Sequence, residues 1–523
     1  MSAKNYVKKD QISHVLLRPQ MYIGSADLRK STEYVATKND DPDADKVYEI
    51  KNKEITTSPA ILRIFIEILS NAIDNYQRSV EAKIPCSYIK VYINKETGET
   101  SVINDGDFIP IAMNKEEKMY NHTLIFGHLL AGSNFDDDKE RQVSGLNGVG
   151  SSACNIFSTS FTVKSLDPDN KLTFEQTWTN NMRTVAEPII GKAKSTKAFT
   201  QVTYFPDFPR FGLKGYTDDI LSQYMKYIID TAILTKVKVY FNDELIPVNN
   251  LLSYSKLFDS PTDESIFIKH GNSEVVLSTS NEFEAITFVN GIFTKLGGTH
   301  LDSWSEELFR PIMNKLNGKK DKPALSIKDV KQFFRIFIVC TVNNPSFESQ
   351  SKNKLESPKV VAEVKSADIN KIWKWSVISD LQDIIKSKEM VALKKSEKKK
   401  KGYVKIEGLD NANLSGTKNS HLCSLILCEG LSAKTYAIAG IEKGVYGYNG
   451  RDYFGVLSLT GKVLNCRNAN LPVISKNKVI TNLIQALGLQ YETDYTDDKN
   501  YKTLAYGRVI LLTDADSDQL TSH

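Results

Sequence analysis

Residues 60–78 read AILRIFIEILSNAIDNYQR and predict one long amphipathic helix. With about 100° between successive side chains, one broad face of this helix is apolar and contains Ile61, Phe65, Ile68, Leu69, Ala72, Ile73 and Tyr76. Ser58 and Pro59 suit its start, because Ser can cap a helix and Pro fits the first turn. The opposite side, within roughly 100° of arc, carries Glu67, Asn71, Asp74, Asn75 and Arg78.

This polar side has two explanations. A helix at a protein surface shows water a polar face, and the stripe alone fits that explanation. A solvent face is usually rich in Lys and Glu, whereas this one sets two amides near a carboxylate. A carboxylate such as Glu67 can accept a proton from water, and an amide oxygen such as that of Asn71 is a hard ligand for Mg²⁺. The helix is therefore a candidate active-site element.

Two glycine-containing loops follow this helix along the chain. Residues 104–110 (NDGDFIP) come after strand-like residues 87–94 and 100–103, and Asn-Asp-Gly is ordinary turn chemistry. The functional alternative gives Asp105 a hydrogen bond from an exocyclic amine such as that of adenine. Residues 145–152 (GLNGVGSS) precede a helix start at 153–157. Glycines let backbone amides approach a phosphate, although this spacing is neither the Walker pattern nor the Rossmann fingerprint.

Composition places the chain among ordinary globular proteins. Its 523 residues predict about three domains, and 41% hydrophobic with 25% charged residues is a usual balance. No stretch approaches the ~18–20 apolar residues of a membrane span. Residues 1–19 lack the apolar core and cleavage site of a secretory signal. We therefore expect an intracellular protein that is neither secreted nor membrane-bound.

Charge and cysteines give weaker indications. The net charge is +4, from 67 basic and 63 acidic residues, and does not by itself require a nucleic-acid partner. Lysines cluster at 394–401 and 315–322, where a solvated loop is the simpler explanation of each cluster. None of the six cysteines forms a CxxC pair, which favours free buried thiols over a zinc site or disulfides.

The chain divides into four predicted segments. Residues 1–240 mix apolar helical stretches with short strands, and residues 241–390 alternate helices with β-rich runs such as 284–289 and 333–342. Residues 391–420 form a basic linker. Residues 421–523 contain two short apolar runs, 422–427 and 508–513, that predict buried parallel strands. The predicted fold class is α/β (α+β).

The helix and the two loops, in this order, resemble the GHKL ATP-binding fold, which gyrase-type topoisomerases, Hsp90 chaperones, MutL repair proteins and histidine kinases share. The flanking residues narrow the resemblance to type IIA DNA topoisomerases. Residues 18–25 (RPQMYIGS) resemble the RPxxYIGS opening of that family, and residues 132–137 (GSNFDD) its serine–asparagine nucleotide loop. Residues 155–158 (NIFS) continue the glycine loop as the eukaryotic and viral branch does.

The second half of the chain carries further resemblances. Residues 289–291 (VNG) and 297–300 (GGTH) look like the opening of the family's transducer domain, and residues 344–352 (NPSFESQSK) resemble its QTK loop. Residues 428–434 (CEGLSAK) resemble the EGDSA motif of the Toprim fold, and residues 514–518 (DADSD) its acidic cluster. The resemblance implies a GHKL-type ATPase sandwich, a transducer domain with a βαβ unit, and a partial, Rossmann-like Toprim domain.

The resemblance also implies a role for each matching residue, with ATP as substrate and Mg²⁺ as cofactor. Glu67 would activate water, Lys352 would approach the γ-phosphate, and Gln350 would support the same loop. Asn71 would hold the ATP-bound Mg²⁺. The other ATP-binding residues would be Asp74, Asn75, Asp105, Ser133, Asn134, Asn147, Gly148, Val149, Gly150, Ser151 and Ser152. The Mg²⁺ used in DNA cleavage would be bound by Glu429, Asp514, Asp516 and Asp518.

Several positions depart from the family's pattern. Ser152 stands where Lys is common, Phe108 replaces the second glycine of DGxGIP, and Leu431 replaces the Asp of EGDSA. Residues 458–462 (SLTGK) differ from PLRGK, and Gln519 follows the acidic cluster in place of Gly. These departures keep open a DNA-binding assembly subunit that has lost hydrolysis. Another GHKL ATPase clamp, MutL-like or Hsp90-like, is the alternative within the fold.

In the family that the chain resembles, ATP closes a dimeric amino-terminal gate around one DNA duplex, and a tyrosine beyond the Toprim domain cuts a second. The implied partners are double-stranded DNA, a second copy through the ATPase domain, and a cleavage domain or separate subunit with the tyrosine. We expect ATP hydrolysis by this chain alone, but neither DNA cleavage nor relaxation. The expected location is DNA-associated, in the nucleus if eukaryotic and in the host cell or virion if viral.

Overall fold

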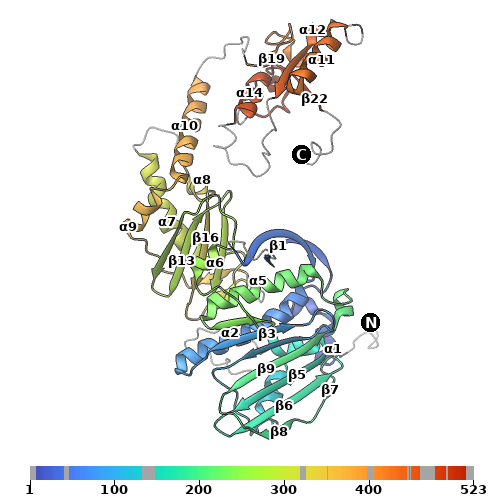
Figure 1. The fold of residues 1–523 in the computed structure, drawn as a ribbon, viewed down its shortest axis with the longest axis vertical. Coiled ribbons are helices and arrows are strands. Elements are labelled where there is room, and N and C mark those ends of the chain that lie inside the picture. The colour runs from blue at the N-terminus through green and yellow to red at the C-terminus, as the bar shows by residue number, and fades with distance from the viewer. Residues whose placement is uncertain are drawn as a thin grey trace, which may run out of the picture. The chain divides into compact units, whose positions relative to one another are not determined.

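The computed structural model describes residues 8–39, 46–131, 148–318, 325–349, 352–396, 406–444, 447, 449–459, 477–490 and 493–513. The chain forms two compact units. Unit 1 is Met1–Leu308 with Phe334–Lys371, and unit 2 is Phe309–Phe333 with Ile372–His523. Both contain helices and sheets (Figure 1), so the mixed α/β class predicted from the sequence is confirmed.

The predicted long helix is α2, Pro59–Ala82, at the centre of unit 1. It begins at Pro59, as expected. Ser58 occupies the N-cap position, but its hydroxyl donates to the Ser25 carbonyl at 3.2 Å and does not cap the helix. The helix ends at Ala82, and the C-cap residue Lys83 has a left-handed φ of 57° and an N–H that bonds back to the last turn. The start was therefore predicted correctly, whereas the role of the Ser58 side chain was not.

A nine-stranded sheet supports α2 and has the order β11-β10-β3-β4-β9-β5-β6-β7, with β8 also paired to β6. All pairs are antiparallel except β10 with β3. Helices α2 and α5 (Asp218–Thr235) lie over one face of this sheet (Figure 1). The strands are β3 (Tyr88–Ile93), β4 (Thr100–Asn104), β5 (Ser158–Asp167), β6 (Leu172–Thr179), β7 (Thr184–Val185), β8 (Ile189–Lys192), β9 (Phe199–Pro206), β10 (Lys238–Phe241) and β11 (Glu244–Leu245).

Aromatic packing between α2 and α5 fixes the rotation of α2. The rings of Phe65 and Tyr224 stack with centroids 4.0 Å apart and planes 5° from parallel. The Tyr224 hydroxyl donates to the Ile61 carbonyl at 2.7 Å. Full burial of such a side chain stabilises the fold by about 1.5–3 kcal/mol. Because the apolar face of α2 is held in this core, its polar side is directed elsewhere, along one wall of a cavity.

Smaller elements of unit 1 surround this core. Strands β1 (Arg29–Lys38) and β2 (Tyr48–Thr57) form an antiparallel pair, in register from Arg29↔Thr57 to Lys38↔Tyr48. The short helices are α1 (Gln11–Leu17), η2 (Pro19–Met21), α3 (Asn121–Gly127), α4 (Gly150–Ile156), η3 (Phe208–Phe211) and α6 (Leu251–Ser255). The cap of α1 is Asp10, whose carboxylate accepts the Ser13 N–H at 2.9 Å.

A five-stranded sheet of order β12-β13-β16-β14-β15 completes unit 1. Strands β14 and β16 are parallel neighbours, and between them the chain passes through α7 (Thr299–Asn317) and α8 (Ile327–Lys331). The predicted βαβ unit is therefore present. The strands are β12 (Ser265–His270), β13 (Ser273–Thr279), β14 (Glu284–Val289), β15 (Ile292–Phe293) and β16 (Phe334–Cys340), followed by the pair β17 (Ser346–Phe347) and β18 (Leu355–Ser357). Phe288 and Phe337 belong to the same hydrophobic core as α2 and α5.

Unit 2 contains a four-stranded sheet of order β19-β21-β20-β22. Strand β20 (Ser424–Glu429) is parallel to β21 (Phe454–Leu459) and β22 (Arg508–Leu512), as the two apolar runs predicted. One core with Leu425 and Leu487 and another with Cys428 and Val456 involve this sheet. The helices are α10 (Val377–Ser396), η4 (Ser420–Leu422), α11 (Gly430–Glu442), α12 (Gly450–Tyr453), α14 (Lys478–Leu487) and α15 (Asp498–Tyr501). Helix α9 (Ser366–Ile372) belongs to unit 1 except for its last residue.

The segment predicted as a basic linker, 391–420, is partly structured. Helix α10 continues to Ser396, and β19 (Leu409–Asp410) pairs antiparallel with β21. The Asn413 N–H also bonds to the Arg451 carbonyl at 2.9 Å. The four-stranded sheet therefore includes residues that the sequence assigned to the linker.

In the described part of the chain, no helix has the length and apolar character that a membrane crossing requires.

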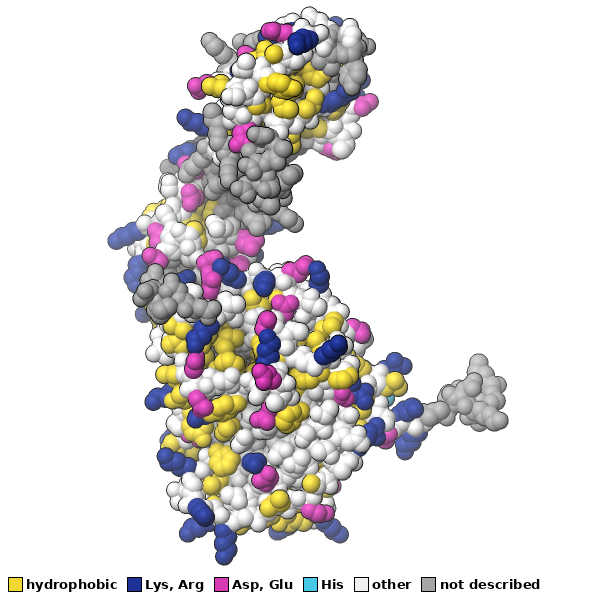
Figure 2. All heavy atoms as spheres, turned by 45° about the vertical axis from the view of Figure 1, so that its right-hand side comes forward, with side chains coloured by type: hydrophobic (Ala, Val, Ile, Leu, Met, Phe, Trp, Pro, Cys, Tyr) yellow, Lys and Arg dark blue, Asp and Glu magenta, His cyan; other side chains and the backbone are white. Residues whose placement is uncertain are grey.

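The described cysteines are free thiols, as predicted; they are Cys86, Cys154, Cys340, Cys423 and Cys428. Cys466 lies outside the described residues. Figure 2 shows that basic, acidic and hydrophobic side chains are intermixed on the visible face of unit 1, without one large patch of a single charge.

Candidate functional site

A cavity of about 550 Å³, cavity A, extends along the polar side of α2. Every residue predicted on that side lines it, namely Glu67, Asn71, Asp74, Asn75 and Arg78. Asp74 and Asn75 are only 3% and 8% exposed, so this part of the polar side of α2 is not a solvated face. Between the two explanations of the polar stripe, the structure favours the site.

Part of the lining of cavity A is apolar and includes a few polar groups, and we call this part the slot. Its walls come from α2, α3, β4, β9 and the loop after β4, through Ile68, Val102, Ile109, Phe126 and Val202. The amide of Asn104 and the side chain of Thr200 also line it. An apolar slot with a few placed hydrogen-bonding groups suits a flat heteroaromatic ring.

The glycine loop enters cavity A at the start of α4. Gly148, Val149, Gly150 and Ser151 line the cavity. Gly148 has a φ of 58°, and a Cβ there would lie 2.5 Å from the Ala131 carbonyl oxygen, so only glycine fits this close approach. The first N–H groups of α4 have no acceptor within the helix, and such an end attracts anions.

Ser152 contributes differently from what the sequence suggested. It is 1% exposed, and its hydroxyl donates to the Val149 carbonyl at 3.1 Å. It is not among the residues that line cavity A. The side chain therefore stabilises the turn into α4 from within the protein, and the part of Ser152 in ATP binding stays a prediction.

Glu67 is held at a defined orientation. Its Oε1 lies 2.5 Å from Nη2 of Arg63, one helical turn earlier, and both side chains are mostly buried. Its Oε2 faces the glycine loop, because a Cβ on Gly150 would lie 2.1 Å from this oxygen. Arg63 was missed in the sequence, although its i,i+4 spacing from Glu67 is the usual signal for an ion pair on a helix.

Asn71 and Lys352 complete the polar end of cavity A. Asn71 Nδ2 donates to Ser151 Oγ at 2.8 Å. Lys352, from the loop between β17 and β18, lines the same cavity and is 8% exposed. Burial lowers the pKa of the Lys352 ammonium, while the negative charges of Glu67 and Asp74 act to raise it. The structure thus places Lys352 on the wall of the cavity that Glu67 and Asn71 also line, and its approach to a γ-phosphate stays a prediction.

Asp105 does not occupy the predicted position. Its carboxylate accepts the N–H groups of Ser87 at 2.8 Å and Tyr88 at 3.0 Å, together with the Ser87 hydroxyl. It is not among the residues that line cavity A. Asp105 therefore fastens its loop to the start of β3, and the neighbouring Asn104, 7% exposed, presents its amide to the slot. The prediction chose the carboxylate over the amide beside it, whereas in the structure the amide is the one that lines cavity A.

Several of the remaining predicted site residues lie in parts of the chain that the structure does not describe. Ser133, Asn134, Asn147, Gln350, Asp514, Asp516 and Asp518 lie outside the described residues. Glu429 is the last residue of β20, and the parallel strand β22 ends at Leu512 opposite Cys428. In the described ranges, no group of three or more His, Cys, Asp or Glu side chains is placed to hold a metal ion.

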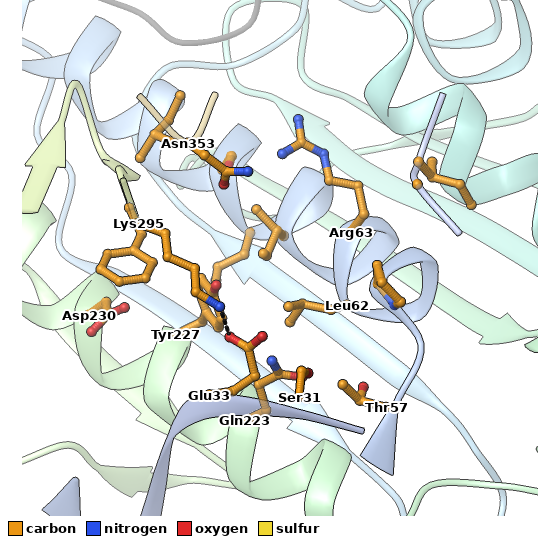
Figure 3. Close-up of a pocket in the computed structure, with 18 of the residues that line it drawn as sticks. Ser31, Glu33, Thr57, Leu62, Arg63, Gln223, Tyr227, Asp230, Lys295 and Asn353 are labelled. Carbon is orange, nitrogen blue, oxygen red and sulfur yellow. Dashed lines mark hydrogen bonds and ion pairs between the residues drawn. The ribbon is translucent and has the colours of Figure 1, made fainter. Parts of the chain in front are cut away.

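A second cavity of about 440 Å³, cavity B, lies on the other side of α2. Figure 3 shows its charged residues, with Lys295 paired to Glu33 at 2.7 Å and Gln223 and Tyr227 of α5 nearby. Leu62 and Arg63 of α2 also line it. Arg63 therefore lies on the wall of cavity B while its guanidinium holds Glu67 of cavity A.

The sheet, the Glu–Asn face of α2 and the glycine loop at α4 together define a protein of the GHKL class. The family model described as DNA gyrase B matches residues 212–402. DNA topoisomerase 2 of Invertebrate iridescent virus 6 is 40% identical over 549 aligned positions, which cover 98% of this chain and 47% of that protein. DNA topoisomerase 2 of Bombyx mori is 37% identical, with coverage of 98% and 34%.

Solved structures give the same result. The ATPase region of Saccharomyces cerevisiae topoisomerase II matches with a TM-score of 0.66 and 31% identity, over 74% of this chain and 100% of that one. The ATPase and transducer domains of DNA topoisomerase II from Balamuthia mandrillaris match with a TM-score of 0.67 and 30% identity, over 76% and 100%. The chain belongs to the type IIA DNA topoisomerase family. It spans about half the length of the viral relative and about a third of the insect one.

Proposed function

We propose that this chain is the ATP-hydrolysing amino-terminal gate of a type II DNA topoisomerase. The observation that carries the proposal is the convergence of Glu67, Asn71, the glycine loop and Lys352 on cavity A, beside an apolar slot. This arrangement supplies a base, an oxygen ligand, phosphate-facing backbone amides and a cation around one ligand-sized space.

The adenine ring fits the apolar slot. The Asn104 amide can both donate to and accept from the edge of an adenine ring, which an acceptor-only carboxylate cannot do. Its own Nδ2 already lies 3.2 Å from the Asp105 carbonyl, which fixes the direction of the amide. We therefore assign adenine recognition to Asn104, with Asn75 and Thr200 beside it, in place of Asp105.

The triphosphate would follow from the slot to the glycine loop. Backbone N–H groups of Gly148, Val149, Gly150 and Ser151 would face the phosphates, with the first turn of α4 favouring their charge. Asn71 carries an oxygen at the correct end of cavity A for Mg²⁺, whose preference for hard oxygen ligands and few protein contacts fits this wall. When bound there, Mg²⁺ would neutralise charge on the phosphates.

Hydrolysis requires positioning and charge stabilisation more than covalent help. Glu67 Oε2 faces the glycine loop and would accept the proton of a water aligned with the γ-phosphate. Lys352 would place its ammonium against the same phosphate and stabilise negative charge that develops in the transition state. The burial of Lys352 strengthens that interaction, because charges attract more strongly where water is excluded.

Lys352 could also couple the bound nucleotide to the conformation of the five-stranded sheet. Its loop is fastened to the segment after β15 by two backbone hydrogen bonds, Leu296 N–H to the Asn353 carbonyl at 2.8 Å and Leu355 N–H to the Gly297 carbonyl at 3.0 Å. A ligand shifts a conformational equilibrium only through contacts that differ between the states. A phosphate-dependent contact of Lys352 would supply such a difference.

In the complete enzyme, we propose that ATP closes a homodimeric gate through this region and that hydrolysis is coupled to passage of one DNA duplex through another. Glu429 would contribute to the Mg²⁺ site for DNA cleavage, with Asp514, Asp516 and Asp518, because β20 and β22 end at the same sheet edge. The tyrosine would come from a further domain or subunit. We expect the protein to be located where its DNA substrate is, in association with that DNA.

Steady-state hydrolysis by the chain, with and without DNA, tests the proposal. Glu67→Gln keeps the size of the side chain and removes its basicity, so we expect a ~10²–10⁴-fold fall in turnover with nucleotide binding retained. Parental turnover in this variant would refute the assignment of Glu67. Absence of hydrolysis in the parental chain, with ATP still bound, would favour the non-hydrolysing assembly subunit.

The gate is tested by sedimentation with a non-hydrolysable ATP analogue and Mg²⁺. We expect a monomer without nucleotide and a dimer with it. A chain that remains monomeric at saturating analogue and micromolar protein concentration would contradict the gate, even if hydrolysis is found.

A further inference from the structure

We infer that Arg63 is a positioning residue for hydrolysis, which keeps Glu67 directed at the glycine loop and separate from Lys352. The inference rests on the proposed function of cavity A. It concerns a residue that contacts neither cavity A nor the slot, and that acts through Glu67.

The geometry of the Glu67 carboxylate is the first step. Arg63 Nη2 engages Oε1 at 2.5 Å, and the two side chains are 16% and 19% exposed. The other oxygen, Oε2, is the one nearest to Gly150. A guanidinium has a planar set of fixed donors, so an ion pair with it fixes the direction of a carboxylate more firmly than a flexible ammonium does. Arg63 therefore selects which oxygen is available to a water at the glycine loop.

The second step concerns Lys352, the other cation near Glu67. The negative charge of Glu67 raises the pKa of the Lys352 ammonium and the positive charge of Arg63 lowers it, so all three groups interact. Without Arg63, the Glu67 carboxylate could pair with the Lys352 ammonium, which lines the same cavity. A Glu67–Lys352 pair would occupy the base and the phosphate-binding cation with each other.

The third step is the support of Arg63 itself. Its side chain extends from α2 on the wall of cavity B, which Asn353 also lines (Figure 3). Asn353 directly follows Lys352, and its carbonyl accepts the Leu296 N–H. Arg63 is on the same helix as Glu67 and shares cavity B with the segment that follows Lys352. From this position its guanidinium can hold the Glu67 carboxylate and keep it from pairing with Lys352.

The test compares Arg63→Gln with Arg63→Lys. A displacement of a reacting group by about 1 Å can cost ~10²-fold in rate, so Arg63→Gln should lower the turnover number by about 10- to 100-fold. The Michaelis constant for ATP should change by less than about threefold, because Arg63 does not line the nucleotide cavity. Arg63→Lys keeps the charge and should recover part of the turnover. Added guanidinium at non-denaturing concentration should also raise the turnover of Arg63→Gln.

Arg210→Gln is the matched control, because Arg210 pairs with Asp207 three residues away at 2.7 Å and lines neither cavity. This variant should hydrolyse ATP at the parental rate. Parental turnover in Arg63→Gln, while Glu67→Gln is inactive, would overturn the inference and leave the proposed function intact. A raised Michaelis constant with unchanged turnover would also overturn it. No hydrolysis by the parental chain would instead refute the proposed function.

Discussion

Replacing Gly150 by alanine should separate hydrolysis from folding. Gly150 is the first residue of α4, and its φ is not in the left-handed region, so its backbone accepts an L side chain. Alanine is the better helix former by up to about 1 kcal/mol in a helix interior. The backbone therefore predicts a variant at least as stable as the parent.

The added methyl group conflicts with Glu67. The Cβ would lie 2.1 Å from Oε2 and 2.9 Å from Cδ of this side chain, whereas ordinary contact begins at 3.4 Å. The difference, 3.4 minus 2.1, requires Oε2 to move by about 1.3 Å. Arg63 holds the other oxygen, so the carboxylate must rotate about that ion pair or leave it. A displacement of about 1 Å at a reacting group costs ~10²-fold in rate, equivalent to about 2.7 kcal/mol.

The assay is steady-state ATP hydrolysis, with nucleotide affinity measured in parallel by equilibrium binding. We expect Gly150→Ala to lower the turnover number by about 10²-fold and to change nucleotide affinity much less. Gly440→Ala is the control, because Gly440 lies inside α11 and a Cβ there meets nothing within 4 Å. It should hydrolyse ATP at the parental rate.

Three results would refute this reasoning. Parental turnover in Gly150→Ala would show that Glu67 Oε2 is not the working oxygen. Loss of nucleotide affinity with normal turnover at saturation would show that the methyl group only obstructs the phosphates. A lowered unfolding midpoint would show that the backbone at Gly150 does not tolerate alanine.

Lys352→Met should lower the turnover number more than it raises the Michaelis constant, because an ammonium at the γ-phosphate stabilises charge that develops in the transition state. A variant with the parental affinity and the parental turnover would show that Lys352 has no part in the mechanism. Lys226 pairs with Asp230 at 2.7 Å, both fully buried, and its Nζ lies 3.6 Å from the Phe293 ring centroid, so Lys226→Met should cost about 3–5 kcal/mol of stability by leaving a buried carboxylate unpaired. Urea unfolding of Lys226→Met and of Lys226→Met/Asp230→Leu checks this, and the double variant should recover most of the loss. Burial lowers the pKa of His122 from 6.5 to about 4, so the unfolded chain takes up a proton between these values that the folded chain does not. The contribution of neutral His122 to the free energy of unfolding is complete above pH 6.5. It falls as the pH drops, by about 2 kcal/mol at pH 5. The urea unfolding midpoint of His122→Gln should therefore decrease less steeply with falling pH than that of the parent.

The sequence by itself determined the elements whose signal is local. The 3.6-residue period of residues 60–78 placed Glu67, Asn71, Asp74 and Asn75 on one side of α2, and all of them line cavity A. The two short apolar runs became the parallel strands β20 and β22. Both patterns repeat within a few residues, so neighbours in the chain are enough to establish them.

The tertiary structure decided which side chain of an adjacent pair reaches the site. Asn104 and Asp105 are equally suited to a turn, and nothing local separates them. Asp105 is turned away because Ser87 and Tyr88, at the start of the paired strand β3, offer N–H groups that a carboxylate accepts. Ser152 is likewise committed to the Val149 carbonyl by its burial at the start of α4.

The tertiary structure also decided which residues from other parts of the chain lie near Glu67. Its meeting with Lys352 depends on a loop after β17 being carried to α2 by the five-stranded sheet, which shares the hydrophobic core of unit 1. Arg63 could have been paired with Glu67 from its spacing, but not placed on the wall of a second cavity. Periodicity along a chain fixes which way a side chain faces on its own element. What that side chain meets is fixed by the burial of apolar surface between elements that are distant in the sequence.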